Sequence, residues 1–184
     1  MGIAMAHESG RYEITENQLL NRTLELLDRL GAVDARAYLE ANQQHVDSRN
    51  RVQIENFRYC LAAVCGDKEE ALRILKTAVI DEGYWYRPEV FDDEDLQSLR
   101  DEPRFNELKE LSYERYQNAL SNISPCCTWK GKNADRILIA LHGNQENLFH
   151  AKAQWDIFRS EKMQVEYIQS GEPDSYGIYR WEED

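Results

Sequence analysis

Residues 136–170, RILIALHGNQENLFHAKAQWDIFRSEKMQVEYIQS, decide how the second part of this 184-residue chain folds. The apolar run 136–141 is rich in β-branched residues and predicts a strand buried on both faces, as in a parallel sheet. A loop that contains a glycine comes next, and then a helix is expected over 147–161. Alternation over 163–168 predicts a second strand. This order predicts a βαβ unit with a right-handed crossover. The inner face of its helix is expected to carry Leu148, Ala151, Trp155 and Phe158.

The residues that precede this stretch predict consecutive amphipathic helices. Thr15 is a residue type that caps helices, and Gly31 is one that ends them. Between them, Leu20, Leu24 and Leu27 recur at helical spacing, so we expect them to share the buried face of the first helix.

Three further helices are expected by the same logic. Their expected first residues are acidic or hydroxyl side chains: Asp34, then Asp47 or Ser48, then Asp67. Gly66 and Gly83 mark the ends of the last two. The apolar residues at helical spacing in these three segments are Ala35, Tyr38 and Leu39, then Ile54, Phe57, Leu61 and Val64, then Leu72, Leu75 and Val79.

Two adjoining stretches resemble a known helical repeat. Residues 59–83, YCLAAVCGDKEEALRILKTAVIDEG, contain a Gly-Asp turn with the Glu-Ala-Leu and later Ala spacing of tetratricopeptide-like units. Residues 83–108, GYWYRPEVFDDEDLQSLRDEPRFNEL, look like the ending common to bacterial proteins of that kind. The resemblance covers about 48–112 and implies antiparallel helical hairpins with a concave face.

An aromatic cluster, Tyr84, Trp85 and Tyr86, lies at the junction of these two stretches. One hypothesis makes the three residues contacts for a protein partner. The alternative is that they pack the hairpin against the last helix. We favour packing, because aromatic residues at the junction of two elements are mostly buried.

The second part resembles an α/β-hydrolase. ILIALHGNQENLFHAKAQW (137–155) looks like the third strand, oxyanion loop and first helix of the carboxylesterase/phospholipase group. VEYIQSGEPDSYGIYRWEED (165–184) looks like that group's fourth strand and the Gly-x-Tyr-x-Trp segment after it. The resemblance covers about 133–184. It implies an oxyanion loop at His142, Gly143, Asn144 and Gln145. A backbone N–H of Asn144 or Gln145 is then the donor, Gly143 lets the chain turn, and His142 is structural.

The nucleophile that such a hydrolase needs is missing from the sequence. That group of enzymes places its serine in a G-x-S-x-G turn, which does not occur in these 184 residues. Ser175 has Pro173 where the first glycine belongs, and Ser170 has Ile168 there. We therefore expect a truncated hydrolase without turnover of its own. A nucleotide-binding βαβ unit is not supported either, since neither G-x-G-x-x-G nor a Walker lysine comes after the strand.

Net charge, cysteine content and the lack of targeting segments limit the classes of partner and the cellular location that we expect. Lys and Arg number 22 against 34 Asp and Glu, and this net charge of −12 argues against nucleic acid and against a membrane surface. The four cysteines form no C-x-x-C pair, and the acidic run 92–95 lacks the Gly and Glu of a calcium loop, so we expect no cofactor or metal. With no signal peptide or membrane span in the sequence, a cytoplasmic protein is expected.

These observations together predict a two-part chain of class α + α/β. A helical tetratricopeptide-like domain is expected over 13–122 and a partial α/β-hydrolase-like segment over 125–184. The expected function is non-catalytic, in protein interaction or assembly. Self-association as a homodimer is expected through the exposed edge of the small sheet. The alternative is part of a carboxylesterase/phospholipase-type serine hydrolase of acyl esters, completed by a C-terminal portion.

Overall fold

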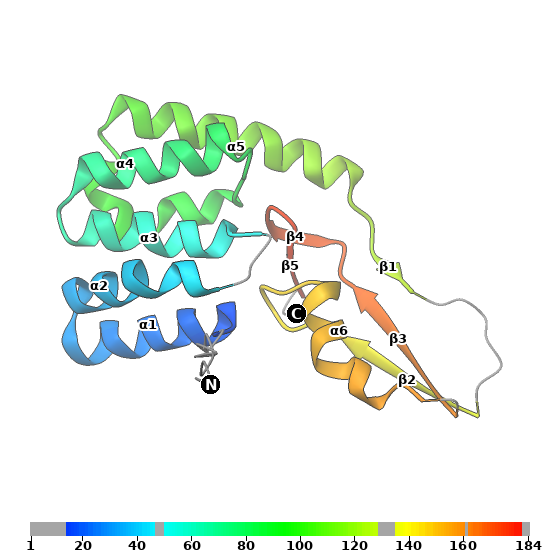
Figure 1. The fold of residues 1–184 in the computed structure, drawn as a ribbon. Helices are drawn as coiled ribbons and strands as arrows, with labels where there is room; N and C mark the ends of the chain where they lie inside the picture. The colour runs from blue at the N-terminus through cyan, green and yellow to red at the C-terminus, as the bar shows by residue number, and fades with distance from the viewer. Residues whose placement is uncertain (1–13, 47–49, 129–134, 161, 182–184) are drawn as a thin grey trace, which may run out of the picture. The chain divides into compact units, whose positions relative to one another are not determined.

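The chain forms a helix-rich mixture of α and β structure (Figure 1). The structure is a computed structural model that describes residues 14–46, 50–128, 135–160 and 162–181. It divides into two compact units, Met1–Ile74 and Leu75–Asp184, and each is described by itself.

The first unit is helical. Its elements are α1 (Glu16–Leu30), α2 (Ala32–Asn42), η1 (Gln43–His45), α3 (Val52–Val64) and most of α4 (Lys68–Lys76). Thr15 caps α1 as predicted, because its hydroxyl accepts the Gln18 N–H while the Gln18 side chain accepts the Thr15 N–H. Gly31 ends α1 with φ +94°. The buried core of this unit consists of Leu19, Leu20, Ala35, Leu39, Val46, Ile54 and Leu61.

The predicted apolar face of α1 is partly wrong. Leu24 is 48% exposed, whereas Leu19 and Thr23 are fully buried. The Thr23 hydroxyl donates to the Leu19 carbonyl at 2.9 Å, which satisfies its polar group inside the core. A pattern that counts only apolar residues overlooks such a buried threonine.

The helix starts also differ from the expectation. Helix α2 begins at Ala32, so Asp34 lies in its first turn and does not cap it. Helix α3 begins at Val52 after Arg51, whereas Asp47 and Ser48 lie outside the described residues. Its last residue, Val64, is 44% exposed and not buried as expected.

The turn between α3 and α4 agrees with the sequence. Gly66 has φ +79°, which a residue without a Cβ adopts readily. The Asp67 N–H donates back to the Ala62 carbonyl at 2.9 Å, and the Asp67 carboxylate accepts the Glu70 N–H at 3.3 Å. Asp67 therefore caps α4 as predicted.

The second unit continues α4 and leads to a small sheet. Its remaining helical elements are the π-helical η2 (Thr77–Asp81), η3 (Pro88–Asp92), η4 (Glu94–Leu99), α5 (Pro103–Asn122), α6 (Leu148–Trp155) and η5 (Asp156–Phe158). Gly83, at φ +74°, comes after η2 as predicted. No helix in the described ranges combines the length and the apolar character needed to cross a membrane.

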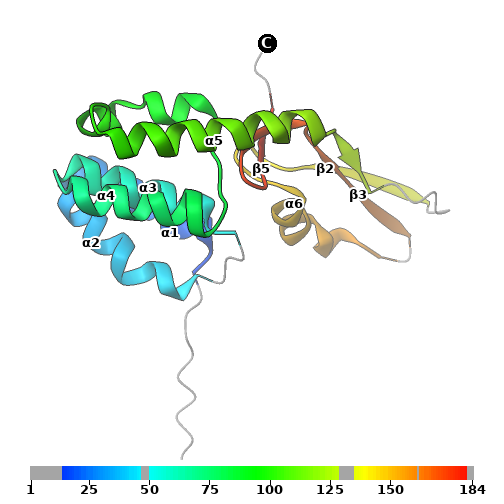
Figure 2. The same cartoon turned by 90° about the horizontal axis from the view of Figure 1, so that it is seen from above.

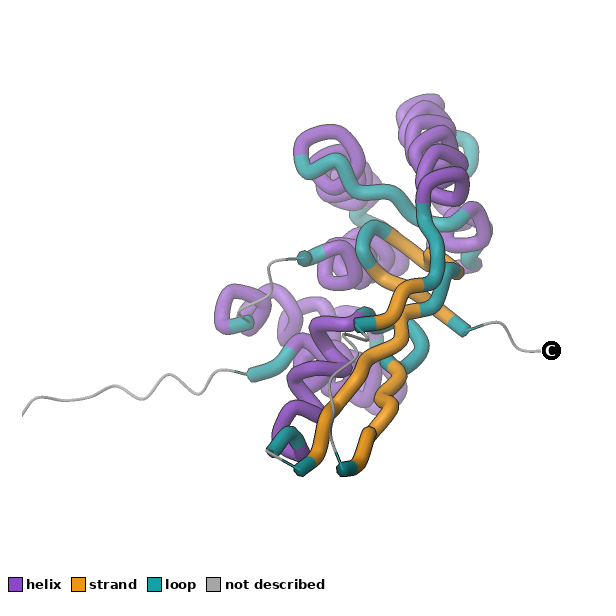
Figure 3. Tube along the Cα trace, turned by 90° about the vertical axis from the view of Figure 1, so that its right-hand side faces the viewer, coloured by secondary structure: helices purple, strands orange, loops and turns teal. Residues whose placement is uncertain are grey.

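The predicted βαβ unit is present. Strand β2 (Arg136–Leu141) runs parallel to β3 (Met163–Gln169), in register from Arg136↔Met163 to Leu141↔Ile168. The short β1 (Cys126–Cys127) pairs antiparallel with the other edge of β3, giving the order β1–β3–β2. Figure 3 shows β2 and β3 side by side as orange tubes. In the described residues, β2 therefore forms one edge of this sheet.

In the described residues, β3 is buried on both faces, whereas β2 is covered on one face only. Helix α6 packs on β2 and β3 through Ala140, Ala151, Val165 and Tyr167 (Figure 2). The prediction of a strand buried on both faces is wrong, because the opposite face of β2 is 42% exposed at Ile137, 58% at Ile139 and 51% at Leu141. The predicted helix is also too long at its end: α6 stops at Trp155, and both Trp155 and the later Phe158 are exposed.

A two-stranded ribbon comes after the sheet. Strands β4 (Glu172–Ser175) and β5 (Ile178–Arg180) pair antiparallel. Within this unit β4 lies against α5, and the Arg87 N–H donates to the Asp174 carbonyl at 3.0 Å. The ribbon is therefore packed against a helix of its own unit.

Candidate functional site

The residues of interest form a loop at the carboxyl end of β2. We name this segment, residues 142–147, the 142–147 loop. In parallel sheets, ligands bind beyond the carboxyl ends of the strands, because loops from neighbouring strands meet there. The loop leads into α6, which begins at Leu148.

His142 anchors the start of the loop. Its side chain is buried, and its ring stacks on Trp181 at 4.8 Å between centroids with 24° between the planes. The Trp181 indole N–H donates to the His142 carbonyl at 2.8 Å. The Ser170 backbone N–H donates to His142 Nε2 at 3.1 Å. The residues just after β3 and β5 thus hold this histidine in place.

These contacts define the tautomer of His142. Because a backbone N–H can only donate, Nε2 must be the acceptor, and the proton resides on Nδ1. Nδ1 lies 2.7 Å from the Gly143 carbonyl, which accepts that proton. Both ring nitrogens are therefore engaged with the backbone, and neither is free to accept a proton from a nucleophile.

Gly143 and Glu146 close the loop on itself. The Gly143 N–H donates to the Glu146 carboxylate at 2.8 Å. A Cβ at position 143 would lie 3.1 Å from Glu146 Oε2, closer than ordinary packing allows. This N–H is consequently occupied by the protein itself, and a side chain at position 143 would have to displace the Glu146 carboxylate by a few tenths of an ångström.

The middle of the loop carries the two residues expected to supply the oxyanion donor. Gln145 has φ +59°, a left-handed conformation that is unusual for a residue other than glycine. The Asn144 side chain accepts the Trp181 backbone N–H at 2.7 Å. The Glu146 carbonyl accepts the Tyr179 N–H at 2.9 Å. Backbone contacts to residues after β4 therefore hold this unusual turn.

Asn147 completes the loop and starts α6. Its side-chain oxygen accepts the N–H groups of Phe149 and His150 at 2.9 and 3.3 Å, which is the bonding of a helix N-cap. Its amide donates to the Gly177 carbonyl at 2.9 Å. The loop is thereby tied at both ends to the ribbon segment 177–181.

Neither serine considered in the sequence is accessible. Ser170 and Ser175 are each 3% exposed. The Ser170 hydroxyl accepts the Glu172 N–H at 2.9 Å. The backbone of Ser175 forms an isolated antiparallel β-bridge with Tyr86. An acyl group could not approach either hydroxyl without local opening of the fold.

The aromatic cluster is part of the packing of this unit. Tyr84, Trp85 and Tyr86 are 6%, 7% and 2% exposed. Trp85 lies 5.8 Å from Tyr116 of α5 and 6.4 Å from Tyr176, between ring centroids. The three side chains therefore offer a partner little surface, in keeping with the packing alternative.

A partly buried ion pair joins Arg87 to the buried Asp174 of β4. The Arg87 guanidinium is 2.9 Å from the Asp174 carboxylate. Burial raises the pKa of Asp174, although Arg87 and Arg180 oppose the shift. Burial likewise raises the pKa of Tyr179.

Two residues that shape the site carry no clear signal in the sequence. Glu146 stabilises the loop, and no motif marks it. Trp181 belongs to the Gly-x-Tyr-x-Trp segment, but its contacts with His142 lie 39 residues away in sequence and no spacing rule predicts them. Asn147 is recognisable from the sequence as a helix cap, because an asparagine directly before the apolar start of a helix is a typical N-cap. In the described part of the chain, no three His, Cys, Asp or Glu side chains gather in a way that could hold a metal ion.

Comparison with solved structures finds a protein of similar fold. It is an uncharacterized protein from Bacillus cereus ATCC 10987, with a crystal structure at 2.75 Å resolution, a TM-score of 0.60 and 27% sequence identity. The match covers 91% of this chain and 55% of that one, so this chain spans about half of that protein's length. No curated protein matches the sequence significantly.

A family model matches the helical part of the chain. It describes an "A/B hydrolase-like, N-terminal domain" and matches residues 15–120, from the cap of α1 into the last turn of α5. This range is more than half of the 184 residues. The chain therefore belongs to the A/B hydrolase-like N-terminal domain family.

Proposed function

We propose that this chain is the N-terminal portion of an α/β-hydrolase-type enzyme that acts on acyl esters. It supplies the oxyanion loop but not the nucleophile. The observation that carries the proposal is the 142–147 loop: an unusual left-handed turn at the carboxyl end of a parallel strand, held by contacts with residues 170 and 177–181. Donors held in advance are what stabilises the oxyanion of a tetrahedral intermediate.

The contacts of the loop support a role for each residue in this proposal. The Gly143 N–H is taken by Glu146, and the proposed oxyanion donor is Asn144 or Gln145. His142 positions the loop and is not the catalytic base, because both ring nitrogens bind backbone groups. With Ser170 and Ser175 buried, the nucleophile comes from polypeptide outside these residues. By themselves, residues 1–184 retain at most the weak rate enhancement that substrate binding and an oxyanion hole supply.

The edge of β2 suggests how such polypeptide would join. A further strand parallel to β2 would end beside the 142–147 loop, because β2 also ends there. A helix of the crossover that connects such a strand would at the same time cover the exposed face at Ile137, Ile139 and Leu141. The length of the Bacillus cereus protein, of which this chain matches 55%, leaves room for such strands.

A second candidate function is protein interaction or assembly without catalysis. The same exposed face of β2 favours it, since contiguous exposed apolar side chains mark interaction sites. In this alternative, two copies pair through the β2 edges as a homodimer. In this alternative the pair α3 and α4 forms a tetratricopeptide-like hairpin, supported by the capped Gly66–Asp67 turn and the buried alanines Ala62, Ala63 and Ala71.

A fluorophosphonate probe tests the two candidates. The 184-residue protein, with its mass confirmed, is treated with the probe and assayed with p-nitrophenyl acetate. The expected result is no adduct and no turnover. The same probe is then applied to the protein isolated from its native cells through an N-terminal tag, and an adduct on a serine outside residues 1–184 is expected.

Two results would overturn the hydrolase proposal in different ways. An adduct on Ser170 or Ser175 of the 184-residue protein would show that this chain holds its own nucleophile. An absence of labelling in both samples would leave assembly as the function. Gly143→Val is the matched variant for the native protein: it crowds Glu146 and should lower turnover while leaving the amount of folded protein measurable by circular dichroism.

A further inference from the structure

A groove in the second unit lies between α5 and η3, far in sequence from the 142–147 loop. It encloses about 230 Å³. We call it the aromatic groove and define it by its lining residues, Tyr86, Pro88, Phe91, Lys109, Glu110 and Tyr113. Its volume is below that of sites for drug-sized ligands and suits one large apolar side chain.

The walls of the aromatic groove are rigid on one side and accessible on the other. Tyr86 and Phe91 are buried and pack edge to face at 6.1 Å between centroids. Tyr113 stands at the rim and is 45% exposed. A preformed apolar pocket with an accessible aromatic rim is the arrangement that takes an anchoring side chain from a protein partner.

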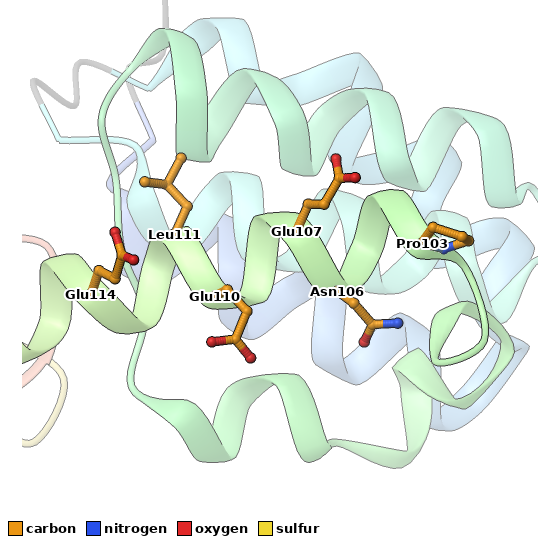
Figure 4. Close-up of a pocket in the computed structure, with 6 residues that line it drawn as sticks. All are labelled: Pro103, Asn106, Glu107, Glu110, Leu111 and Glu114. Atoms are coloured by element: carbon orange, nitrogen blue, oxygen red, sulfur yellow. The ribbon is translucent and has the colours of Figure 1, made fainter.

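The charge around the groove is predominantly negative. The single cation in its lining, Lys109, is already paired with Asp92 at 2.8 Å, and it lowers the pKa of that carboxyl. Glu110 belongs to the lining, and it also belongs to a row of exposed glutamates on α5, which we call the acidic row: Glu107, Glu110 and Glu114. Figure 4 shows them in succession along the helix.

The acidic row has no partner within the described chain. None of its three carboxylates takes part in a hydrogen bond or ion pair with another described residue. Their spacing of three and four residues puts them on one side of α5, over a rise of about 10 Å. Cations at the same spacing on a second helix would face them one by one.

We propose that the aromatic groove is a docking site for a basic helical segment of a partner protein. The segment inserts one apolar side chain into the groove, and its Lys or Arg side chains pair with the acidic row. Charge complementarity selects this occupant: a chain with a net charge of −12 repels nucleic acid and anionic lipid but attracts a basic peptide. This docking site does not depend on the proposed hydrolase function.

The test measures binding of a fluorescent peptide to the full 184-residue chain by anisotropy. The probe is a helical peptide with lysines spaced three and four residues apart and a leucine between them. A micromolar dissociation constant is expected at low salt, weakened at higher ionic strength. The triple variant Glu107→Gln, Glu110→Gln, Glu114→Gln should weaken binding about tenfold, the sum of three exposed ion pairs.

Matched variants separate docking from general attraction to an acidic protein. Asp28→Asn, Asp34→Asn and Glu82→Gln remove the same charge elsewhere and should change the dissociation constant less than twofold. Tyr113→Ala should weaken binding about tenfold by removing the rim of the groove, and Tyr113→Phe should restore it. The exposed position of Tyr113 makes both variants compatible with folding.

Three outcomes would overturn the proposal. They are equal weakening by the control triple variant, equal binding of a peptide with glutamates in place of the lysines, and no binding at about millimolar peptide. Equal displacement of the probe by a small organic amine would also overturn it, because the groove would then be a site for a small cation and not for a peptide.

Discussion

The helical core around α1–α3 and the small sheet around β2 differ in how far their large apolar side chains are exposed. In the helical core, Leu19, Leu39 and Ile54 are fully buried. In the sheet, Ala140, Val165 and Tyr167 pack against Ala151 of α6, while three large side chains of β2 face outward. Single apolar side chains are exposed on the helices too, such as Leu30 at 61% and Val33 at 72%, but on β2 three of them share one face of a strand. The difference lies in how the exposed apolar side chains are grouped.

The largest expected effect concerns the buried helical core. Leu39→Ala removes a fully buried side chain from the helical core and should lower the free energy of unfolding by about 2–5 kcal/mol, through lost burial and the cavity left behind. Urea denaturation measures it. Leu24→Ala, at a site 48% exposed, should cost less than about 1 kcal/mol. Equal costs would mean that this core is not closed.

The next effect concerns how the 142–147 loop is held. His142→Ala leaves the buried Ser170 N–H without its acceptor and removes the stacking on Trp181, so we expect a loss of about 2 kcal/mol in unfolding free energy. Hydrogen exchange at the Ser170 amide should accelerate in parallel. His150→Ala serves as the control, because that ring lies against the Asn147 side chain, and it should leave the Ser170 amide protected.

A smaller effect is expected at the exposed face of β2. If two copies pair through β2, Ile139→Lys should weaken the dimer about tenfold, because it replaces an apolar side chain at the centre of the exposed face with a charge. Sedimentation velocity across a concentration series measures this. An unchanged dimer constant, or a wild-type protein that stays monomeric, would contradict pairing through this face and leave the additional-strand model.

The smallest effect compares two carboxyls with opposite pKa shifts. The hydrogen bond from Arg36 lowers the pKa of Asp67, so its contribution to stability is present above the ordinary value of 3.8 and is lost as pH falls. Burial raises the pKa of Asp174, so the folded state loses stability as pH rises from 3.8 through the raised value.

Urea midpoints between about pH 2 and 7 check these signs. Relative to wild type, Asp67→Asn should lose stability as pH rises toward 3.8, and Asp174→Asn should gain stability as pH rises above 3.8. Parallel curves for the two variants would show that burial does not control Asp174.

The sequence predicts local features of this molecule well and long-range ones poorly. Strand β2 has the predicted bounds, because an apolar run before His-Gly needs no tertiary information. The Thr15 cap and the Gly66–Asp67 turn arise from residues close together in the chain. Exposure of Ile139 could not be predicted, because burial depends on which elements lie alongside the strand.

The same limit applies to the candidate site. The position of the loop was predictable from its place after a strand. Its support was not, since the contacts from Ser170 and Trp181 to His142 join residues 28 and 39 positions apart. Thr23 shows the converse error: a polar residue becomes part of the core because the helix backbone satisfies its hydroxyl.

The stacking of Trp181 on His142 gives the loop an optical signal of its own. An imidazole ring stacked on an indole quenches the fluorescence of that indole. Emission from Trp181 therefore reports the closeness of the two rings. Replacing the other three tryptophans, of the four in the sequence, with phenylalanine would leave a single fluorophore. Its lifetime would report on the loop in solution as ligands, partners or further strands are added.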